Sequence, residues 1–339
     1  MTLRRALGVL GTTAAVTAAV GIAARHRALA TIPPELRHPV LYLPLNFTNA
    51  AALAVGRRLV SIPGSSVRSG IDVEQRTVAP TATEPAVTVL TYQAPNRPTP
   101  SGALLWIHGG GTIMGSARQA HAWCSRVAEE LGVLVITVEY RLAPENPYPA
   151  ALNDCYSALR WLHDNATDLG IDPARIIVGG ESAGGGLAAT VAQRAHDTGL
   201  PVRFQLLIYP MLDDRTVLRA EAHDPGVYTW TPASNLFAWT AYLGRPPAER
   251  DERPYIAAAR RGDLTGLPPA WIGVGDIDLF HDEDVEYAHR LHDAGVACEL
   301  HIEPGMYHGA DELLDGKASS MTAFRNTALD ALRNAMTTP

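Results

Sequence analysis

Short uninterrupted apolar runs alternate along most of the chain with longer segments in which apolar positions recur every three to four residues. The first pattern is typical of strands buried on both faces of a sheet, and the second of helices that cover one. The runs that predict strands are 103–107, 133–138, 176–178, 204–209, 270–274 and 297–302. The segments that predict helices are 118–131, 148–165, 187–195, 282–294 and 318–335. This alternation predicts an α/β fold with a mostly parallel central sheet, helices on both faces and right-handed crossovers.

Further elements are expected ahead of this alternation. Residues 71–78 and 86–92 predict two more strands, and the second of them alternates in part between apolar and polar residues. Earlier still, Pro33-Pro34 and residues 46–60 predict helices, the second with Thr48 or Asn49 as its N-cap. A helical segment before the first strand is well placed to cover a site at one edge of the sheet.

One long segment, residues 213–262, interrupts the alternation. Its aromatic residues stand among polar and charged ones without strand periodicity; they are Tyr228, Trp230, Phe237, Trp239 and Tyr242. We interpret the segment as an inserted helical cap whose aromatic side chains line a pocket or pack within the cap itself. The chain then divides into an N-terminal segment, a first cap segment, one α/β domain in two parts, and the inserted cap. Their bounds are 1–30, 31–66, 67–212 with 263–339, and 213–262.

The stretch from Arg175 to Leu187 stands at the centre of this pattern. The apolar run Ile176–Val178 predicts a strand, and it is followed by Gly180-Glu181-Ser182-Ala183-Gly184 and an alanine-rich helix. This is the GxSxG pattern, in which the serine occupies a sharp strand-to-helix turn with its hydroxyl exposed. Glycines two residues to either side are needed because a Cβ there would crowd the turn.

A second glycine-rich loop follows an earlier strand. Residues 103–107 end directly in His108-Gly109-Gly110-Gly111. Residues without side chains leave their backbone N–H groups accessible, so this loop can donate hydrogen bonds to a developing negative charge. We interpret it as an oxyanion loop, with a simple flexible turn as the alternative. His108 is expected to brace the loop through hydrogen bonds.

Composition narrows the function classes. A chain of 339 residues with 47% hydrophobic residues can bury a large core, and its net charge of −7 argues against nucleic acid as a partner. The cysteines Cys124, Cys155 and Cys298 have no CxxC spacing, so they indicate neither a zinc site nor a disulfide framework. We expect each to be a small buried apolar residue.

The N-terminus allows two interpretations. Arg4 and Arg5 precede an uncharged run over residues 6–24, and Ala28-Leu29-Ala30 has the small residues of a cleavage site. Together these features are typical of an export signal with twin arginines. The run is rich in alanine, threonine and glycine, which makes it weakly apolar for a membrane span. Export or membrane tethering and an ordinary N-terminal helix of a cytoplasmic protein therefore both stay open.

The motifs HGGG, YRLAPE, GESAGG, DLFHDE and YHG, taken together, resemble the hormone-sensitive-lipase-like family of carboxylesterases, bacterial family IV of the α/β-hydrolase fold. The similarity spans roughly residues 103–309. It implies that Ser182 is the nucleophile, Asp278 the triad acid and His308 the base. It also implies that the amides of Gly110, Gly111 and Ala183 form the oxyanion hole, with His108 and Gly109 supporting that loop.

Two departures from the family pattern concern its subfamily and substrate. Glu181 stands where aspartate is more usual, and DLFHDE lacks the commoner proline and arginine. The residues that would react are present.

Elementary chemistry leads to the same three residue types. A serine hydroxyl is a poor nucleophile at neutral pH, so it needs an imidazole to take its proton and a carboxylate to orient that imidazole. The order Ser182, Asp278, His308 is the one expected of this fold. Asp276 is the rival for the acid. Asp282 and Glu283 fit the start of a helix, and the remaining C-terminal histidines fit surface or packing positions.

The sequence thus predicts a serine hydrolase that cleaves carboxylic esters through an acyl-enzyme, with no metal or organic cofactor. The family resemblance implies short to medium acyl chains, and homodimers are a habit of the family. Two alternatives stay open. One is an amidase, deacetylase or lactone hydrolase on the same scaffold, and the other is a ligand-binding receptor without catalysis.

Overall fold

The computed structural model describes residues 29–43, 46–60, 66–219 and 228–337. Almost all of the segment expected as an export signal or N-terminal helix, residues 1–28, therefore lies outside the described residues. Within the described ranges, no helix combines the length and the apolar character needed to cross a membrane.

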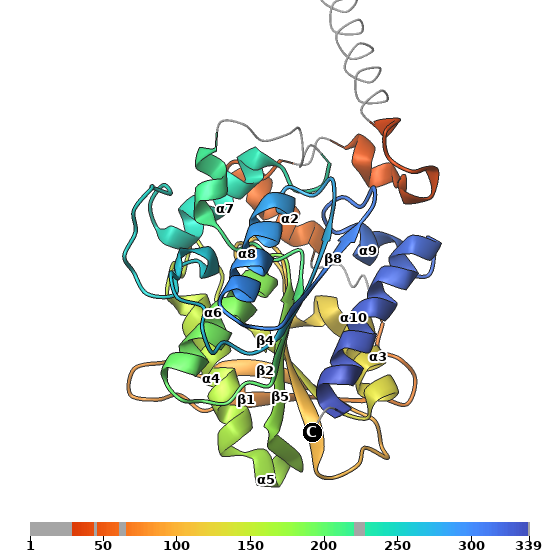
Figure 1. Ribbon diagram of the computed structural model, residues 1–339, viewed down its shortest axis with the longest axis vertical. Coiled ribbons are helices and arrows are strands. Elements are labelled where there is room, and N and C mark those ends of the chain that lie inside the picture. Colours follow the sequence, from red (N-terminus) through yellow and green to blue (C-terminus); the bar gives the residue numbers. More distant parts are fainter. Residues whose placement is uncertain (1–28, 44–45, 61–65, 220–227, 338–339) are drawn as a thin grey trace, which may run out of the picture.

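An eight-stranded sheet forms the centre of the molecule, with its strands in the order β1-β2-β4-β3-β5-β6-β7-β8 (Figure 1). The strands are β1 (Asp72–Val78), β2 (Val87–Gln93), β3 (Ser101–Ile107), β4 (Leu134–Glu139), β5 (Ile171–Glu181), β6 (Phe204–Ile208), β7 (Ala270–Gly275) and β8 (Cys298–Glu303). The pairs β1/β2 and β2/β4 are antiparallel, and the pairs from β4/β3 to β7/β8 are parallel. The predicted mostly parallel sheet is confirmed.

Helices cover both faces of this sheet, and further helices lie above its carboxyl edge (Figure 1). The α-helices are α2 (Ala50–Val60), α3 (His121–Leu131), α4 (Ala150–Asp164), α5 (Ala166–Leu169), α6 (Ala183–Asp197), α7 (Pro232–Leu243), α8 (His281–Asp293), α9 (Ala310–Leu314) and α10 (Ser319–Thr337). Short 3-10 helices are η1 (Pro34–Leu36), η2 (Pro39–Tyr42), η3 (Ala117–Ala120), η4 (Asp214–Leu218) and η5 (Ala258–Arg260).

The central strands feed two separate hydrophobic cores. Along β5, Ile176 and Val178 join the core under α4, α6 and α8, whereas Ile177 joins the core under α3 and α10. Successive side chains of a strand point to opposite faces of the sheet, so a strand covered on both faces must be apolar at every position. This is why the runs in the sequence are uninterrupted rather than alternating.

Most predicted elements are present, with shifted boundaries. The predicted N-cap of α2 is confirmed, since Oδ1 of Asn49 accepts the amide of Ala52 at 3.0 Å. The helix expected over 148–165 is present as α4, and the short α5, which was not expected, follows it. Strand β5 begins earlier than expected, at Ile171. Cys298 is only half-buried, contrary to expectation, because β8 is an edge strand of the sheet.

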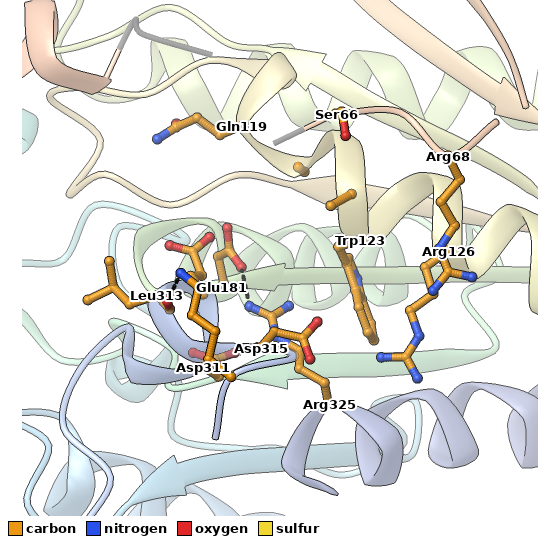
Figure 2. Close-up of a pocket in the computed structure, with 14 residues that line it drawn as sticks. Ser66, Arg68, Gln119, Trp123, Arg126, Glu181, Asp311, Leu313, Asp315 and Arg325 are labelled. Atoms are coloured by element: carbon orange, nitrogen blue, oxygen red, sulfur yellow. Dashed lines mark hydrogen bonds and ion pairs between the residues drawn. The ribbon is translucent and has the colours of Figure 1, made fainter. Parts of the chain in front are cut away.

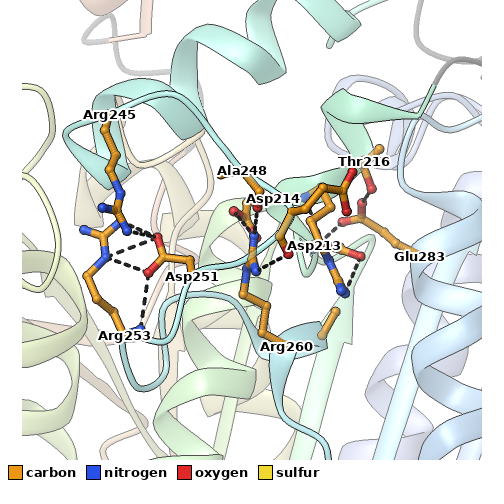
Figure 3. Close-up of polar contacts among 12 residues, drawn as sticks. Asp213, Asp214, Thr216, Arg245, Ala248, Asp251, Arg253, Arg260 and Glu283 are labelled. Atoms are coloured by element: carbon orange, nitrogen blue, oxygen red, sulfur yellow. Dashed lines mark hydrogen bonds and ion pairs between the residues drawn. The ribbon is translucent and has the colours of Figure 1, made fainter.

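The segment 213–262 is less helical than its aromatic content suggested. In its described part, α7 is joined by η4, η5 and irregular chain. Ion pairs hold much of the irregular chain (Figure 3), among them Arg260 with Asp214 at 2.6 Å and Arg253 with Asp251 at 2.7 Å. Buried polar pairing therefore replaces helical periodicity over much of this segment.

The two cap segments meet above the carboxyl ends of the strands. Phe47, just before α2, donates its amide to the hydroxyl of Ser234 in α7 at 3.0 Å. Arg57 in α2 donates to the backbone oxygens of Ile113 at 2.7 Å and Ala143 at 2.8 Å, and pairs with Glu145 at 2.7 Å. The YRLAPE stretch therefore anchors α2, and both segments are fixed around the same edge of the sheet.

Candidate active site

Ser182 occupies the sharp turn between β5 and α6. Its backbone has φ of 54° and ψ of −124°, a region that side-chain-bearing residues rarely adopt. Three hydrogen bonds hold it there: its amide donates to Ile208 O at 2.9 Å, and its carbonyl accepts from Gly186 N at 3.0 Å and Met211 N at 2.9 Å. The surrounding backbone thus imposes the conformation that projects the hydroxyl.

The flanking glycines are required by close backbone contacts. A Cβ on Gly180 would lie 2.4 Å from the carbonyl oxygen of Gly184, and one on Gly184 would lie 2.1 Å from that of Ile107. Both distances are far below a normal van der Waals contact. The crowding inferred from the GxSxG pattern is therefore present at both positions.

The structure brings Ser182, His308 and Asp278 together although they are far apart in the sequence. The Ser182 hydroxyl lies 2.9 Å from Nε2 of His308, and Nδ1 of His308 lies 2.9 Å from Oδ2 and 3.1 Å from Oδ1 of Asp278. A carboxylate can only accept a hydrogen bond, so Nδ1 of His308 carries the ring proton and donates a hydrogen bond to Asp278. Nε2 is then free of a proton and accepts a hydrogen bond from the Ser182 hydroxyl. The rival acid Asp276 instead accepts the amide of Gly305 at 2.6 Å.

The environment of His308 keeps its ring fixed and mostly dry. Asp278 is 1% exposed and His308 9% exposed. Tyr209 and Phe280 approach the imidazole edge-on, with ring centroids at 4.7 and 5.0 Å, and Trp230 from the cap lies 6.4 Å away. These aromatic residues exclude water from the ring, which strengthens its hydrogen bonds to Ser182 and Asp278.

The HGGG loop passes directly over the serine. A Cβ on Gly109 would lie 3.3 Å from the Cβ of Ser182. Gly110 and Gly111 adopt φ of 104° and 62°, and a side chain on Gly111 would run into the ring of Trp230 at 2.4 Å. In the described part of the chain, neither of these two glycines donates its amide to a backbone carbonyl.

Ala183 supplies a third amide near the serine, because it is the first residue of α6. The first N–H groups of a helix have no partner within the helix and carry its positive dipole end. The amides of Gly110 and Gly111 thus belong to the loop that lies against Ser182, and the amide of Ala183 belongs to the residue that follows it.

His108 lies beneath the glycine loop and is fully buried. Its Nδ1 donates to the carbonyl of Gly109 at 2.8 Å, and its ring stacks on Tyr140 with centroids 4.2 Å apart. The Tyr140 hydroxyl donates to the carbonyl of His108 at 3.0 Å. Burial lowers the pKa of His108 to about 4, so the ring is neutral at physiological pH. These contacts connect the HGGG loop to the first residue of YRLAPE.

A narrow pocket opens beside Ala183 between α6 and the cap. The residues that define it include Thr112, Ala183, Gly186, Thr190, Trp239 and Tyr242. Its free volume is about 10 Å³, roughly the room of one water molecule. Trp239 and Tyr242 are thus the cap aromatics that line this pocket, while Tyr228 lies against Tyr307, 6.0 Å between ring centroids.

Comparisons with known proteins show which family the chain belongs to. A family model described as an alpha/beta hydrolase fold matches residues 104–311. Carboxylesterase NlhH of Mycobacterium tuberculosis is 36% identical over 285 residues, a match that covers 82% of this chain and 88% of that protein. This chain belongs to the hormone-sensitive-lipase-like carboxylesterases. It is a carboxylic ester hydrolase, as its relatives of that name are.

Solved structures of carboxylesterases superpose closely on it. A structure described as bacterial heroin esterase is 38% identical, with a TM-score of 0.85, and the match covers 92% of this chain and 100% of that one. Esterase LipW of Mycobacterium marinum is 34% identical, with a TM-score of 0.78, covering 92% and 98%. The α/β-hydrolase fold expected from the sequence is therefore confirmed.

Sequence reasoning missed several residues around this carboxylesterase site. Tyr209 ends the predicted strand 204–209 and Phe280 lies within DLFHDE, yet nothing in their spacing indicates contact with His308. Glu283 was assigned to a helix start. It is buried, and its Oε1 accepts the amides of Leu212 at 2.7 Å and Asp213 at 3.2 Å, so it orients the chain leading into the cap (Figure 3).

Proposed function

We propose that the chain is a serine carboxylesterase that hydrolyses short- to medium-chain carboxylic esters through an acyl-enzyme, with Ser182 as nucleophile, His308 as base and Asp278 as acid. The observation that carries this proposal is the continuous hydrogen-bonded line from the Ser182 hydroxyl through both ring nitrogens of His308 to Asp278. The three side chains are buried beneath a cap, where water does not weaken the hydrogen bonds between them.

The reaction follows from these contacts. The Ser182 oxygen attacks the ester carbonyl carbon while its proton moves to Nε2 of His308, and the carbonyl electron pair becomes an oxyanion. Nε2 then returns the proton to the departing alcohol oxygen as the carbon–oxygen bond breaks. Water repeats the sequence on the acyl-enzyme, releasing the acid and restoring the serine. Asp278 holds the ring in the required tautomer and stabilises its charged form.

The oxyanion is stabilised by the amides of Gly110, Gly111 and Ala183. Removing one such donor from a comparable enzyme costs about 3 to 4 kcal/mol of transition-state stabilisation. The loop needs positive φ at two successive positions, Gly110 and Gly111, and glycine adopts positive φ without strain. The two glycines therefore allow the loop to present these amides. His108 and Gly109 support the loop through the hydrogen bonds that their carbonyls accept from the Tyr140 hydroxyl.

The acyl group occupies the pocket beside Ala183 and Thr112. This pocket adjoins the proposed oxyanion donors, so an acyl chain whose carbonyl oxygen points to those amides extends into it. Its small free volume and the indole of Trp239 leave room for about a methyl group, so acetyl esters are the preferred substrates.

The test is the kinetics of p-nitrophenyl acetate hydrolysis by Ser182→Ala and by a control, Ser319→Ala. Ser319 is an exposed serine whose hydroxyl contacts Glu35 at 3.1 Å. The proposal predicts that Ser182→Ala loses nearly all turnover and that the control keeps it. Full activity in Ser182→Ala would refute the nucleophile.

Matched ester and amide substrates separate esterase from amidase, deacetylase or related activities. The proposal expects the ester to be turned over much faster than the amide of the same acyl group. An amide turned over as fast as its ester would favour the alternative. A complete lack of reaction with a fluorophosphonate probe would indicate a binding protein.

A further inference from the structure

A buried ionic cluster lies behind the candidate site, on the α10 side of the sheet. We call Glu181, Asp311 and Arg325 the Arg325 cluster. The side chain of Arg325, on α10, is 5% exposed; its Nε lies 2.5 Å from Oδ2 of Asp311 and its Nη2 lies 3.4 Å from Oε2 of Glu181. Figure 2 shows the guanidinium between the two acids. No function considered above uses these residues.

The two acids belong to the two loops that must meet for hydrolysis. Glu181 is the last residue of β5 and is bonded directly to Ser182. Asp311 is the second residue of α9, three residues beyond His308. One guanidinium therefore joins the backbone that carries the nucleophile to the backbone that carries the base, through a helix that is remote in sequence from Ser182.

The cluster combines an ion pair of Arg325 with Asp311 and a longer hydrogen bond from Arg325 to Glu181. Burial raises the pKa of Glu181 well above its ordinary value, and the neighbouring Glu312 raises it further, so the protonated form of Glu181 is favoured. Burial opposes the charge of Arg325, but Asp311 and the other acids around it outweigh burial and raise its pKa. The guanidinium stays charged, with Asp311 as its closest counter-ion.

A cavity of about 390 Å³ borders the cluster on one side, next to Trp123 and Asp315 (Figure 2). The guanidinium carbon lies 5.1 Å from the centroid of the Trp123 ring, which fixes the arginine through a cation–π contact. Glu181 and Asp311 line this cavity together with Arg325, whose guanidinium contacts both acids.

We propose that Arg325 is a positioning residue for ester hydrolysis, which sets the distance between the Ser182 hydroxyl and Nε2 of His308 by holding Glu181 and Asp311 together. This inference rests on the proposed function, in which those two groups exchange a proton. It also gives a role to Glu181, which stands where the family more usually has aspartate. Glutamate has one methylene group more than aspartate, and this length lets its carboxyl group reach Arg325.

The experiment compares four variants with the wild-type protein on p-nitrophenyl acetate, recording kcat, KM and Tm. Arg325→Met removes the link and Arg325→Lys restores the charge without the planar fork. The triple variant Glu181→Gln, Asp311→Asn, Arg325→Met removes the link and every ionisable group of the Arg325 cluster, so that no buried charge is left unpaired. Arg97→Met is the control, because Arg97 lies away from the site. It donates to the Ser101 hydroxyl and to the Leu169 carbonyl, both at 2.6 Å.

The proposal expects kcat to fall by about 10- to 100-fold in both the Met and triple variants, with KM within about twofold, because small misplacements of reacting groups cost that much. Arg325→Lys is expected to recover part of kcat, and Arg97→Met to lower Tm without lowering kcat. If Arg325→Met does not fold, the triple variant carries the test.

Several results would overturn the inference. A triple variant with wild-type kcat, or a loss confined to KM, would show that Arg325 contributes to stability or binding only. A kcat that simply follows Tm across all variants, including Arg97→Met, would do the same. Failure of the proposed function is read separately, as retained activity in Ser182→Ala, so the two failures are distinguishable.

Discussion

Replacing Asp278 with asparagine probes the proton arrangement most sharply. Oδ1 of Asp278 accepts the amide of Phe280 at 2.9 Å, and both carboxylate oxygens face Nδ1 of His308. Asparagine is nearly isosteric and keeps its oxygen on Phe280, so the loop is retained. Its amide nitrogen then faces Nδ1 and acts as a donor, which moves the ring proton to Nε2. A protonated Nε2 cannot take the proton of Ser182.

The size of the loss follows from this change of tautomer. In a serine hydrolase with the same arrangement, the equivalent replacement lowers kcat by about 10⁴-fold, or ~5 kcal/mol of transition-state stabilisation. We expect a loss of about that size in Asp278→Asn, with KM little changed because the ester-binding surfaces are untouched. Steady-state hydrolysis of p-nitrophenyl acetate measures both quantities.

The matched control is Asp276→Asn in the same loop. Asp276 bonds to Gly305 N rather than to His308, and asparagine can still accept that hydrogen bond. Its kcat is expected to stay within about threefold of wild type. The reasoning is refuted if Asp276→Asn loses more activity than Asp278→Asn, since the carboxylate that orients the ring would then be the other one.

Three further predictions concern folding, pH and substrate range. Gly184→Ala, whose Cβ would lie 2.1 Å from a backbone oxygen, is expected to fail to fold or to lose several kcal/mol, whereas Gly262→Ala, with open space around it, is expected to keep its Tm in thermal unfolding. Burial raises the pKa of Glu283 to about 8, so the folded protein holds a proton that the unfolded chain releases. The free energy of unfolding should therefore fall as the pH rises from about 5 to 8, and Glu283→Gln should reduce the slope of this fall by up to ~1.4 kcal/mol per pH unit. The exposed control Glu299→Gln should leave the slope unchanged. Equal slopes in the two variants would contradict the raised pKa of Glu283. Trp239→Leu enlarges the pocket beside Ala183. The ratio of kcat/KM for a hexanoate ester to that for an acetate ester should then rise at least about tenfold, since each buried CH₂ contributes ~0.8 kcal/mol. An unchanged ratio would exclude this pocket as the acyl site.

The fold was accessible from the sequence because its central strands are buried on both faces. Apolar runs that are followed by glycines, such as Ile176–Val178, predict strands rather than helices. The alternation of these runs with helical segments predicts a mostly parallel sheet. Parallel strands bring their carboxyl ends to one edge, so loops that follow different strands were expected to meet there. The structure places the loops carrying Ser182, Asp278 and His308 at that edge.

Other parts of the site depend on contacts that leave no local pattern. The pairing of Arg325 with Glu181 spans 144 residues, and neither residue shows a periodicity or spacing that indicates the other. The same holds for Tyr209 against His308 and for Arg57 against the loop after HGGG. The cap was expected to be helical, but side chains satisfy part of its irregular backbone instead, as where Arg260 donates to the carbonyl of Glu249 at 3.2 Å. Such tertiary pairings cannot be derived from a single sequence.

Trapping the covalent intermediate tests the central claim most directly. Wild-type protein, Ser182→Ala and His308→Ala are treated with a fluorophosphonate probe, and the modified peptide is identified by mass spectrometry. We predict a label on the peptide containing Ser182 in the wild-type protein, no label at that position in Ser182→Ala, and a labelling rate lowered by orders of magnitude in His308→Ala. A label on another residue, or labelling of Ser182 at an unchanged rate without His308, would contradict the account.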